Sequence, residues 1–101
     1  MEPVVSAMRI ARKSLGLSPS KVASIAGLSE KYVFLIESGA RNPSITTAVK
    51  CCLASGMTDR EIADAISDFW VDEKSAERMI KLVREAILLE ADIAKLIRGY
   101  S

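Results

Sequence analysis

The chain has 101 residues and a mass of 11.0 kDa, which is the size of one small domain. Half of its residues are hydrophobic, only 5% are aromatic, and glycine and proline are scarce, so the composition favours an all-α fold with an aliphatic core. The sequence contains no histidine, which excludes His-based catalysis and His-ligated metal sites.

The net charge of +1 hides a difference between the two parts of the chain. Residues 1–57 carry seven Lys or Arg against three Asp or Glu, a net charge of +4. Residues 58–101 carry seven Lys or Arg against ten Asp or Glu, a net charge of −3. We therefore expect the first part to face an anion such as nucleic acid and the second part to have another task.

Cys51 and Cys52 are adjacent, and neighbouring side chains on a helix point about 100° apart, so they do not form an ordinary structural disulfide. Two sulfurs are also too few for a zinc site. We expect two buried or half-buried thiols, no metal and no cofactor. Reduced thiols, a beginning unlike a signal peptide, and the lack of an apolar run near ~20 residues predict a cytoplasmic protein without a membrane partner.

Apolar residues recur at helical spacing along the chain, and Ser, Thr, Pro and Gly mark the ends of the helical segments. One of these signals is a capping box, formed by Thr58 and Glu61. No alternation of apolar and polar residues persists, so we predict no strand. The expected helices span residues 3–14, 19–26, 30–38, 45–54, 59–69 and 72–98.

The second and third of these helices are joined at Gly27 by a tight turn, which makes a helix-turn-helix. The full pattern is Ser18-x-x-x-Val22-Ala23-x-x-Ala26-Gly27-Leu28-Ser29-x-x-Tyr32-Val33-x-x-Ile36-Glu37-x-Gly39-x-Arg41-Asn42-Pro43-Ser44. This pattern resembles the Cro/repressor-type, or XRE-like, family of bacterial and phage DNA-binding proteins over residues 8–57. The alternative is an ordinary small helical domain whose Ala and Gly residues only aid packing.

We expect an all-α fold, with a five-helix repressor-like helix-turn-helix domain followed by a long C-terminal amphipathic helix. We place the DNA-binding domain at residues 1–57 and a helical C-terminal extension at residues 58–101. The resemblance implies double-stranded DNA as the partner. We expect no enzymatic activity, because no nucleophile–base pair can be assembled without histidine and no carboxylate pair sits in a visible pocket motif. In the family, the outer face of the third helix enters the major groove with its N-terminal end leading. A helical wheel of that segment gives an outer face of Glu30, Lys31, Phe34, Leu35 and Ser38, and Ser29 lies at its leading end. The candidates for reading base edges are Ser29, Glu30, Lys31, Phe34 and Leu35.

Glu30 could accept a hydrogen bond from cytosine N4, and Lys31 could donate to guanine O6 or N7. Phe34 and Leu35 depart from the polar residues that are usual at these positions in the family. They could pack on thymine methyl groups, or they could cover a neighbouring element or a partner protein.

Further positions resemble those of the family that contact the DNA backbone. Pro19 stands where the family most often has Gln, so the residues around it must supply the contacts at that helix end. Arg9 and Lys13 could add phosphate contacts or be solvated surface. By their positions in the motif, Arg12 and Glu37 resemble a partly buried ion pair that positions the recognition helix. The candidates for backbone contacts are Ser18, Ser20, Lys21, Ser38, Arg41, Asn42 and Ser44.

The last helix carries a wide apolar stripe with spacings of three and four residues, which favours a dimerisation element. The alternative is that the whole stripe belongs to the core of one chain. The candidates for the dimer contact are Met79, Leu82, Val83, Ala86, Leu89, Ile93 and Leu96.

These features together predict a homodimer that binds a palindromic operator. Repression is the simplest outcome because it requires only that a promoter be occupied, whereas activation needs a surface for the polymerase. A different class of function stays open, namely an antitoxin-like or other interaction module that holds a partner protein through its acidic helical tail. Salt-dependent binding to duplex DNA would separate the two.

Overall fold

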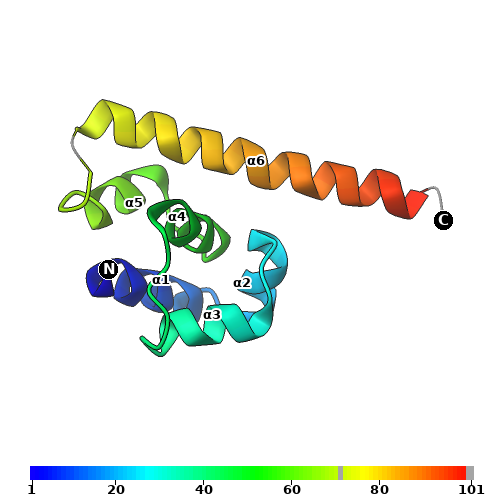
Figure 1. Cartoon of the computed structure of the whole chain (residues 1–101), viewed down its shortest axis with the longest axis horizontal. Coiled ribbons are helices and arrows are strands. Elements are labelled where there is room, and N and C mark those ends of the chain that lie inside the picture. The colour runs from blue at the N-terminus through cyan, green and yellow to red at the C-terminus, as the bar shows by residue number, and fades with distance from the viewer. Residues whose placement is uncertain (71, 100–101) are drawn as a thin grey trace.

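The structure is a computed structural model that describes the backbone of residues 1–70 and 72–99 and the side chains of residues 1–70 and 72–90. The described part is all-helical, as the composition predicts (Figure 1). A helix-turn-helix domain is followed by one long helix. The helices are α1 (Glu2–Ser14), α2 (Pro19–Ala26), α3 (Glu30–Glu37), α4 (Ile45–Ala54), α5 (Asp59–Ala65) and α6 (Glu73–Gly99).

Four of these helices begin at the Ser and Thr residues that the sequence marks. The Oγ of Ser18 accepts the backbone N–H of Lys21 at 3.1 Å, and the side chains of Ser29, Ser44 and Thr58 cap α3, α4 and α5 in the same way. Each cap satisfies a backbone donor that has no partner inside its own helix. The local sequence therefore fixes where α2 to α5 start.

The fifth helix is shorter than expected, because it ends at Ala65 instead of continuing to residue 69. The reason lies in the polar residues that follow it. The Ser67 hydroxyl donates to the carbonyl of Asp64 at 2.8 Å, and the Ser67 N–H donates to the same oxygen at 3.3 Å. This local bonding competes with the helical pattern and turns the chain toward α6.

The interior has two apolar clusters. The smaller one holds α2 between α3 and α4. The larger one is built by α1, α3, α4, α5 and α6 together, so the predicted boundary after residue 57 does not coincide with a break in the core. The buried residues of the larger cluster are Val4, Val5, Met8, Ile36, Ala48, Val49, Cys51, Cys52, Met57, Ile62, Ile66, Ala76, Ile80 and Val83.

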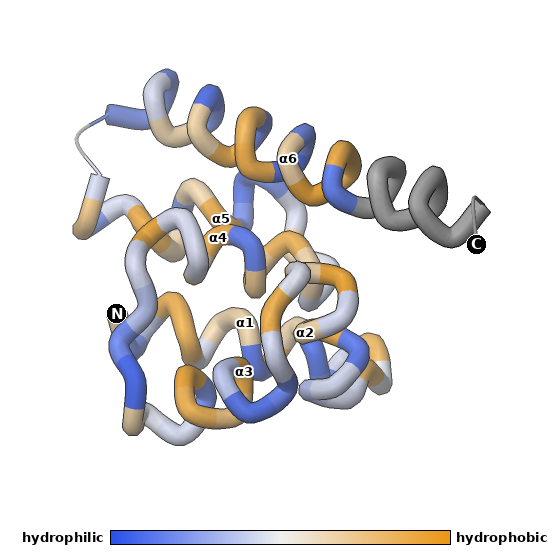
Figure 2. Tube along the Cα trace, turned by 45° about the vertical axis from the view of Figure 1, so that its right-hand side comes forward, coloured by the Kyte–Doolittle hydropathy of each residue, from blue (hydrophilic) through white to orange (hydrophobic). Residues whose placement is uncertain are grey.

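The long helix α6 lies across α4 and α5 and then projects beyond the rest of the molecule (Figure 1). Its 27 residues correspond to about 40 Å, close to the 45 Å length of the whole molecule. In the coloured part of α6, hydrophobic and hydrophilic residues alternate along its turns (Figure 2). Ala76, Ile80 and Val83 point into the shared core, so one face of α6 belongs to the fold of its own chain.

Cys51 and Cys52 lie on α4, and both are free and buried, as expected. Burial raises the pKa of the Cys51 thiol to about 11 and that of Cys52 to about 12. Among the described residues, no group of three or more His, Cys, Asp or Glu side chains is arranged to hold a metal ion. None of the helices in the described part combines the length and the apolar character needed to cross a membrane.

Candidate nucleic-acid interface

Helix α3 has one face in the core and one in solvent, as the helical wheel predicts. Val33 and Ile36 are fully buried, whereas the Phe34 side chain is 62% exposed. Glu30 and Lys31, in the first turn, are exposed as well. Leu35 is half-buried and offers less surface than the other candidates. The outer face of α3 therefore presents an acidic, a basic and an aromatic side chain to solvent.

Ser29 directly precedes α3 and is already engaged in the fold. Its Oγ accepts the backbone N–H of Tyr32 at 3.1 Å. The hydroxyl hydrogen stays available, because a serine hydroxyl can accept and donate at the same time. Ser29 is thus first of all the cap of α3, and its predicted role in reading bases stays a prediction.

The loop after α3 is held against the helix that precedes it. The Arg41 N–H donates to the carbonyl of Leu35 at 3.0 Å, and the guanidinium carbon of Arg41 lies 5.8 Å from the centroid of the Tyr32 ring. This cation–π contact orients a side chain that is otherwise exposed. Asn42 and Ser44 follow in the same loop and are exposed too, with the Ser44 side chain capping α4.

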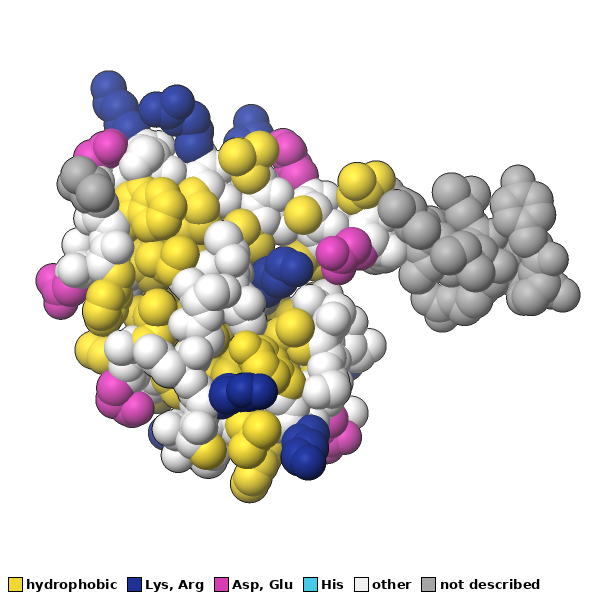
Figure 3. Space-filling view, in the orientation of Figure 1, with side chains coloured by type: hydrophobic (Ala, Val, Ile, Leu, Met, Phe, Trp, Pro, Cys, Tyr) yellow, Lys and Arg dark blue, Asp and Glu magenta, His cyan; other side chains and the backbone are white. Residues whose placement is uncertain are grey.

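The remaining candidates for backbone contacts surround the start of α2 and the end of α3. Ser18, Ser20 and Lys21 are exposed at the N-terminus of α2, where the helix dipole favours an anion. Ser38, at the end of α3, is exposed, and its hydroxyl donates to the carbonyl of Leu35 at 3.1 Å. Figure 3 shows basic and hydrophobic side chains next to one another at the α3 end of the molecule.

The predicted ion pair between Arg12 and Glu37 is present. The Nε and Nη2 atoms of Arg12 donate to the two carboxylate oxygens of Glu37 at 2.9 and 2.8 Å. The Nη1 atom of Arg12 donates to the carbonyl of Leu17 at 2.9 Å, and both charged side chains are only 10% exposed. One guanidinium therefore joins α1, the loop before α2 and the end of α3 with charge-assisted bonds.

Arg9 has a role that the sequence analysis missed. Its Nη2 donates to the backbone carbonyl of Glu37, and its Nε lies 3.8 Å from the Glu37 carboxylate. Arg9 is thus turned toward the end of α3. The available signal was the spacing of Arg9 and Arg12, because residues three apart share one face of a helix.

The apolar stripe of α6 divides between the core and the surface. Leu82 and Leu89 are 66% and 61% exposed, and Ala86 between them is exposed, whereas Met79 is half-buried against the core. The assignment of Val83 to a dimer contact is wrong, because Val83 is buried in the core of its own chain. The side chains of Ile93 and Leu96 lie outside the described residues.

Comparison with known proteins agrees with this arrangement. A family model described as helix-turn-helix matches residues 8–62, which include α2, α3 and the loops around them. Comparisons with curated proteins and with solved structures gave no match. The matched region covers more than half of the chain and contains the candidate interface. The chain therefore belongs to the Cro/repressor-type, XRE-like helix-turn-helix family of transcription regulators that bind double-stranded DNA.

Proposed function

We propose that the protein binds a palindromic operator as a homodimer and represses transcription by occupying a promoter. The observation that carries this proposal is the division of α3, which buries Val33 and Ile36 and leaves Glu30, Lys31 and Phe34 exposed. An α-helix exposed in this way fits the major groove, whose base edges are distinct for every base pair.

The three exposed side chains suit three different contacts in the groove. Lys31 can donate to guanine O6 or N7, and Glu30 can accept from cytosine N4. Phe34 offers an apolar surface that matches a thymine methyl group. Lys21 and Arg41, on either side of α3 in sequence, would contact phosphates and fix the register of the helix on the duplex.

A second copy is proposed because one such module reads too few base pairs for useful specificity. Members of the family bind two half-sites about 34 Å apart. Leu82 and Leu89 support a dimer through α6, because both are more than half exposed and both lie on the side away from the core. At about 100° per residue, these two side chains point within about 20° of each other.

The test is selection of bound sequences from random duplex DNA by the full chain, together with sedimentation of the protein and transcription in vitro from a promoter that contains the selected site. We expect a palindromic sequence, a dimer at micromolar concentration and less transcript with added protein. Selection of a single unrepeated half-site by a monomer would contradict the homodimer. An increase in transcript would contradict repression.

The alternative is that the protein holds a partner protein through α6. This alternative is favoured by exposed leucines on an acidic segment, namely Leu82, Leu88 and Leu89. Co-purification of a second polypeptide in fixed proportion, lost when Leu82 and Leu89 are replaced by Lys, would support this function. If the purified complex contained only one copy of this chain, the result would argue against the homodimer.

A further inference from the structure

A single side chain of α6 reaches both the turn of the helix-turn-helix and α4. The Oε2 atom of Glu90 lies 2.9 Å from the point where a Cβ atom on Gly27 would stand. The Oε1 atom of the same carboxylate lies 3.9 Å from Nζ of Lys50 on α4. Gly27 joins α2 to α3 in the left-handed conformation, with φ of 71°. The turn that aims α3 is therefore in contact with α6.

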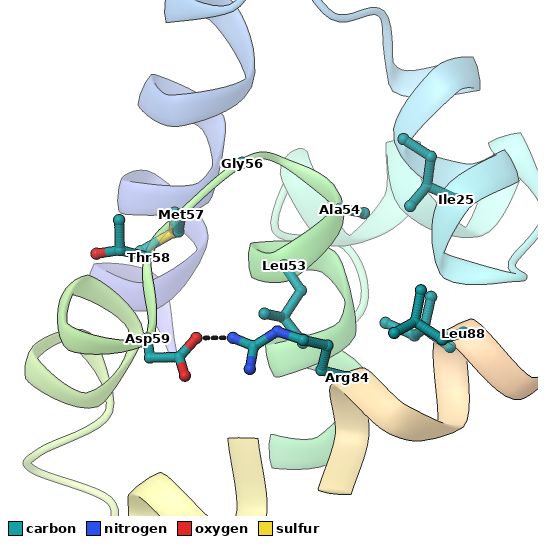
Figure 4. A pocket seen from close by; sticks show the side chains of 10 residues that line it. Ile25, Leu53, Ala54, Gly56, Met57, Thr58, Asp59, Arg84 and Leu88 are labelled. Atoms are coloured by element: carbon teal, nitrogen blue, oxygen red, sulfur yellow. Dashed lines mark ion pairs between the residues drawn. The ribbon is translucent and has the colours of Figure 1, made fainter. Parts of the chain in front are cut away.

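Next to this contact, α6 and α2 are separated by an open groove of about 460 Å³. Ile25 of α2 and Leu88 of α6 face the groove from opposite sides, and an ion pair between Arg84 and Asp59 borders it (Figure 4). Ile25 and Leu88 are 41% and 58% exposed. Apolar packing across the groove is thus incomplete. Beside it, the Glu90 carboxylate pairs with Lys50 of α4 and lies against Gly27 of the turn.

We infer that Glu90 is a positioning residue that holds α6 at a defined angle to the helix-turn-helix and thereby sets the distance between the two recognition helices of a dimer. This inference rests on the proposed homodimer through α6. Leu89, on the proposed contact face, is the neighbour of Glu90 in sequence, so the dimer contact and the contact to the turn share one turn of helix.

Small changes in this angle have large effects at the DNA. The body of the molecule below α6 is of the order of 20 Å deep, since the shorter dimensions of the molecule are 29 and 23 Å. A tilt of about 10° over a lever of roughly 20 Å moves its far end by about 3.5 Å, which is one base-pair step. A contact that limits tilt therefore limits which half-site spacing both recognition helices can reach.

An exposed ion pair contributes little to overall stability, so the chain stays folded when the pair is lost. The loss instead allows the angle between α6 and the helix-turn-helix to vary. The Glu90 side chain is 57% exposed and that of Lys50 is 28% exposed. The affinity for an isolated half-site stays unchanged, because α3 itself is intact. Only the discrimination between spacings decreases.

The experiment measures the affinity of the full-length protein for the selected palindrome, for the same palindrome with one base pair inserted at its centre, and for one half-site. We expect Glu90→Gln to reduce the preference for the correct spacing about threefold, in line with the modest strength of an exposed pair. Glu77→Gln is the matched control, because it removes a carboxylate from the same helix away from the turn. Exchange of the charges, Glu90→Lys with Lys50→Glu, should restore most of the preference.

The outcomes separate this inference from the function on which it rests. A Glu90→Gln protein that remains a dimer and keeps the spacing preference of the parent overturns the positioning role and leaves the proposed function intact. An equal loss of affinity for the half-site overturns it too, because the defect would then lie in α3. A parent that is monomeric and indifferent to spacing overturns the homodimer itself.

Discussion

Two arginine side chains of α1 contact Glu37, at the end of α3. The C-terminal end of a helix carries a partial negative charge, so an acidic residue there is unfavourable unless a cation compensates it. Arg12 provides that compensation with two hydrogen bonds, and Arg9 adds a third to the backbone carbonyl of Glu37. The pair fixes α3 against α1 and leaves the outer face of α3 free.

Replacement of this carboxylate should therefore be costly. We expect Glu37→Ala to lower the free energy of unfolding by ~3–5 kcal/mol, because the Arg12 guanidinium would stay buried without its partner. Thermal and urea unfolding measure the effect. Glu30→Ala is the control on the same helix, since Glu30 is exposed and should change stability by about 0.5 kcal/mol or less. Equal melting temperatures for Glu37→Ala and the parent would contradict a structural role for the pair.

Lys31 is a test of base reading, because it is exposed in the first turn of α3. We expect Lys31→Ala to weaken binding to the selected operator by ~1–3 kcal/mol and to relax the preference at one position in each half-site. Binding curves on a series of single-base variants measure this. Lys74→Ala, on α6, should bind like the parent. A uniform loss on all sequences would instead make Lys31 a phosphate contact.

Arg41 is a test of backbone contacts, because its guanidinium is exposed and oriented above Tyr32. We expect Arg41→Ala to weaken binding to every sequence alike and to reduce the salt dependence by about one ion per subunit. The slope of the logarithm of affinity against the logarithm of salt concentration gives the number directly. Arg60→Ala, in the acidic part of the chain, should leave the slope unchanged. An unchanged slope for Arg41→Ala would remove Arg41 from the interface.

At the scale of the element, α4 is the helix on which α1, α2, α5 and α6 all pack. It carries the two cysteines, and the raised pKa of each thiol means that the folded protein keeps its thiol protons above the pH at which an unfolded chain releases them. The stability that this provides is complete below the ordinary thiol pKa near 9 and is lost as the pH rises toward 11 to 12.

The free energy of unfolding should therefore fall between pH 9 and about 11, by up to ~1.4 kcal/mol per pH unit for each thiol. Urea unfolding at a series of pH values measures this slope. The variant with Cys51→Ala and Cys52→Ala is the control. It should be less stable at pH 7 because of the lost packing, but its stability should depend less on alkaline pH. The same steep alkaline slope in this variant would assign the effect to other groups.

At the scale of the whole molecule, α6 has two faces in different surroundings. Ala76, Ile80 and Val83 complete the core, whereas Leu82 and Leu89 are left at the surface. Exposed leucines at this spacing on a helix are typical of an assembly contact, because a surface of this kind is stabilised when a second helix covers it.

Replacement of both leucines tests whether the outer face of α6 forms the proposed dimer contact. We expect Leu82→Lys with Leu89→Lys to abolish the dimer, because the like charges of two copies would face each other without partners. The variant should keep its helix content, since neither side chain belongs to the core. Its affinity for the full operator should fall to that of a single half-site, while weak binding to any duplex persists. Sedimentation, circular dichroism and operator binding measure the three properties.

Leu88→Lys is the matched control for this experiment. Leu88 is 58% exposed on the same helix but faces the groove beside α2, about 100° from Leu89. The Leu88→Lys variant should remain dimeric. A double variant that unfolds would show that the outer face of α6 contributes to the fold of one chain, and a parent that is monomeric at micromolar concentration would place the contact elsewhere.

The sequence by itself determined the helical class, the starts of α2 to α5 and the two faces of α3. These features depend on interactions within a few residues, such as the Ser18 and Ser29 caps, and on the period of 3.6 residues that separates Val33 and Ile36 from Phe34. The ion pair of Arg12 and Glu37 could be predicted as well, but only because both positions resemble those of a pair in the family. The early end of α5 was missed, although its cause, the side chain of Ser67, is also local.

The tertiary structure alone decided how the stripe of α6 is divided. The apolar period of a helix identifies its hydrophobic positions, but it does not say which of two surfaces will cover them. Val83 and Leu82 are adjacent, yet one is buried by the core and the other is exposed, because α4 and α5 lie against only one side of α6. The contact of Glu90 with Gly27 has the same origin, since it joins residues far apart in sequence that no spacing rule connects.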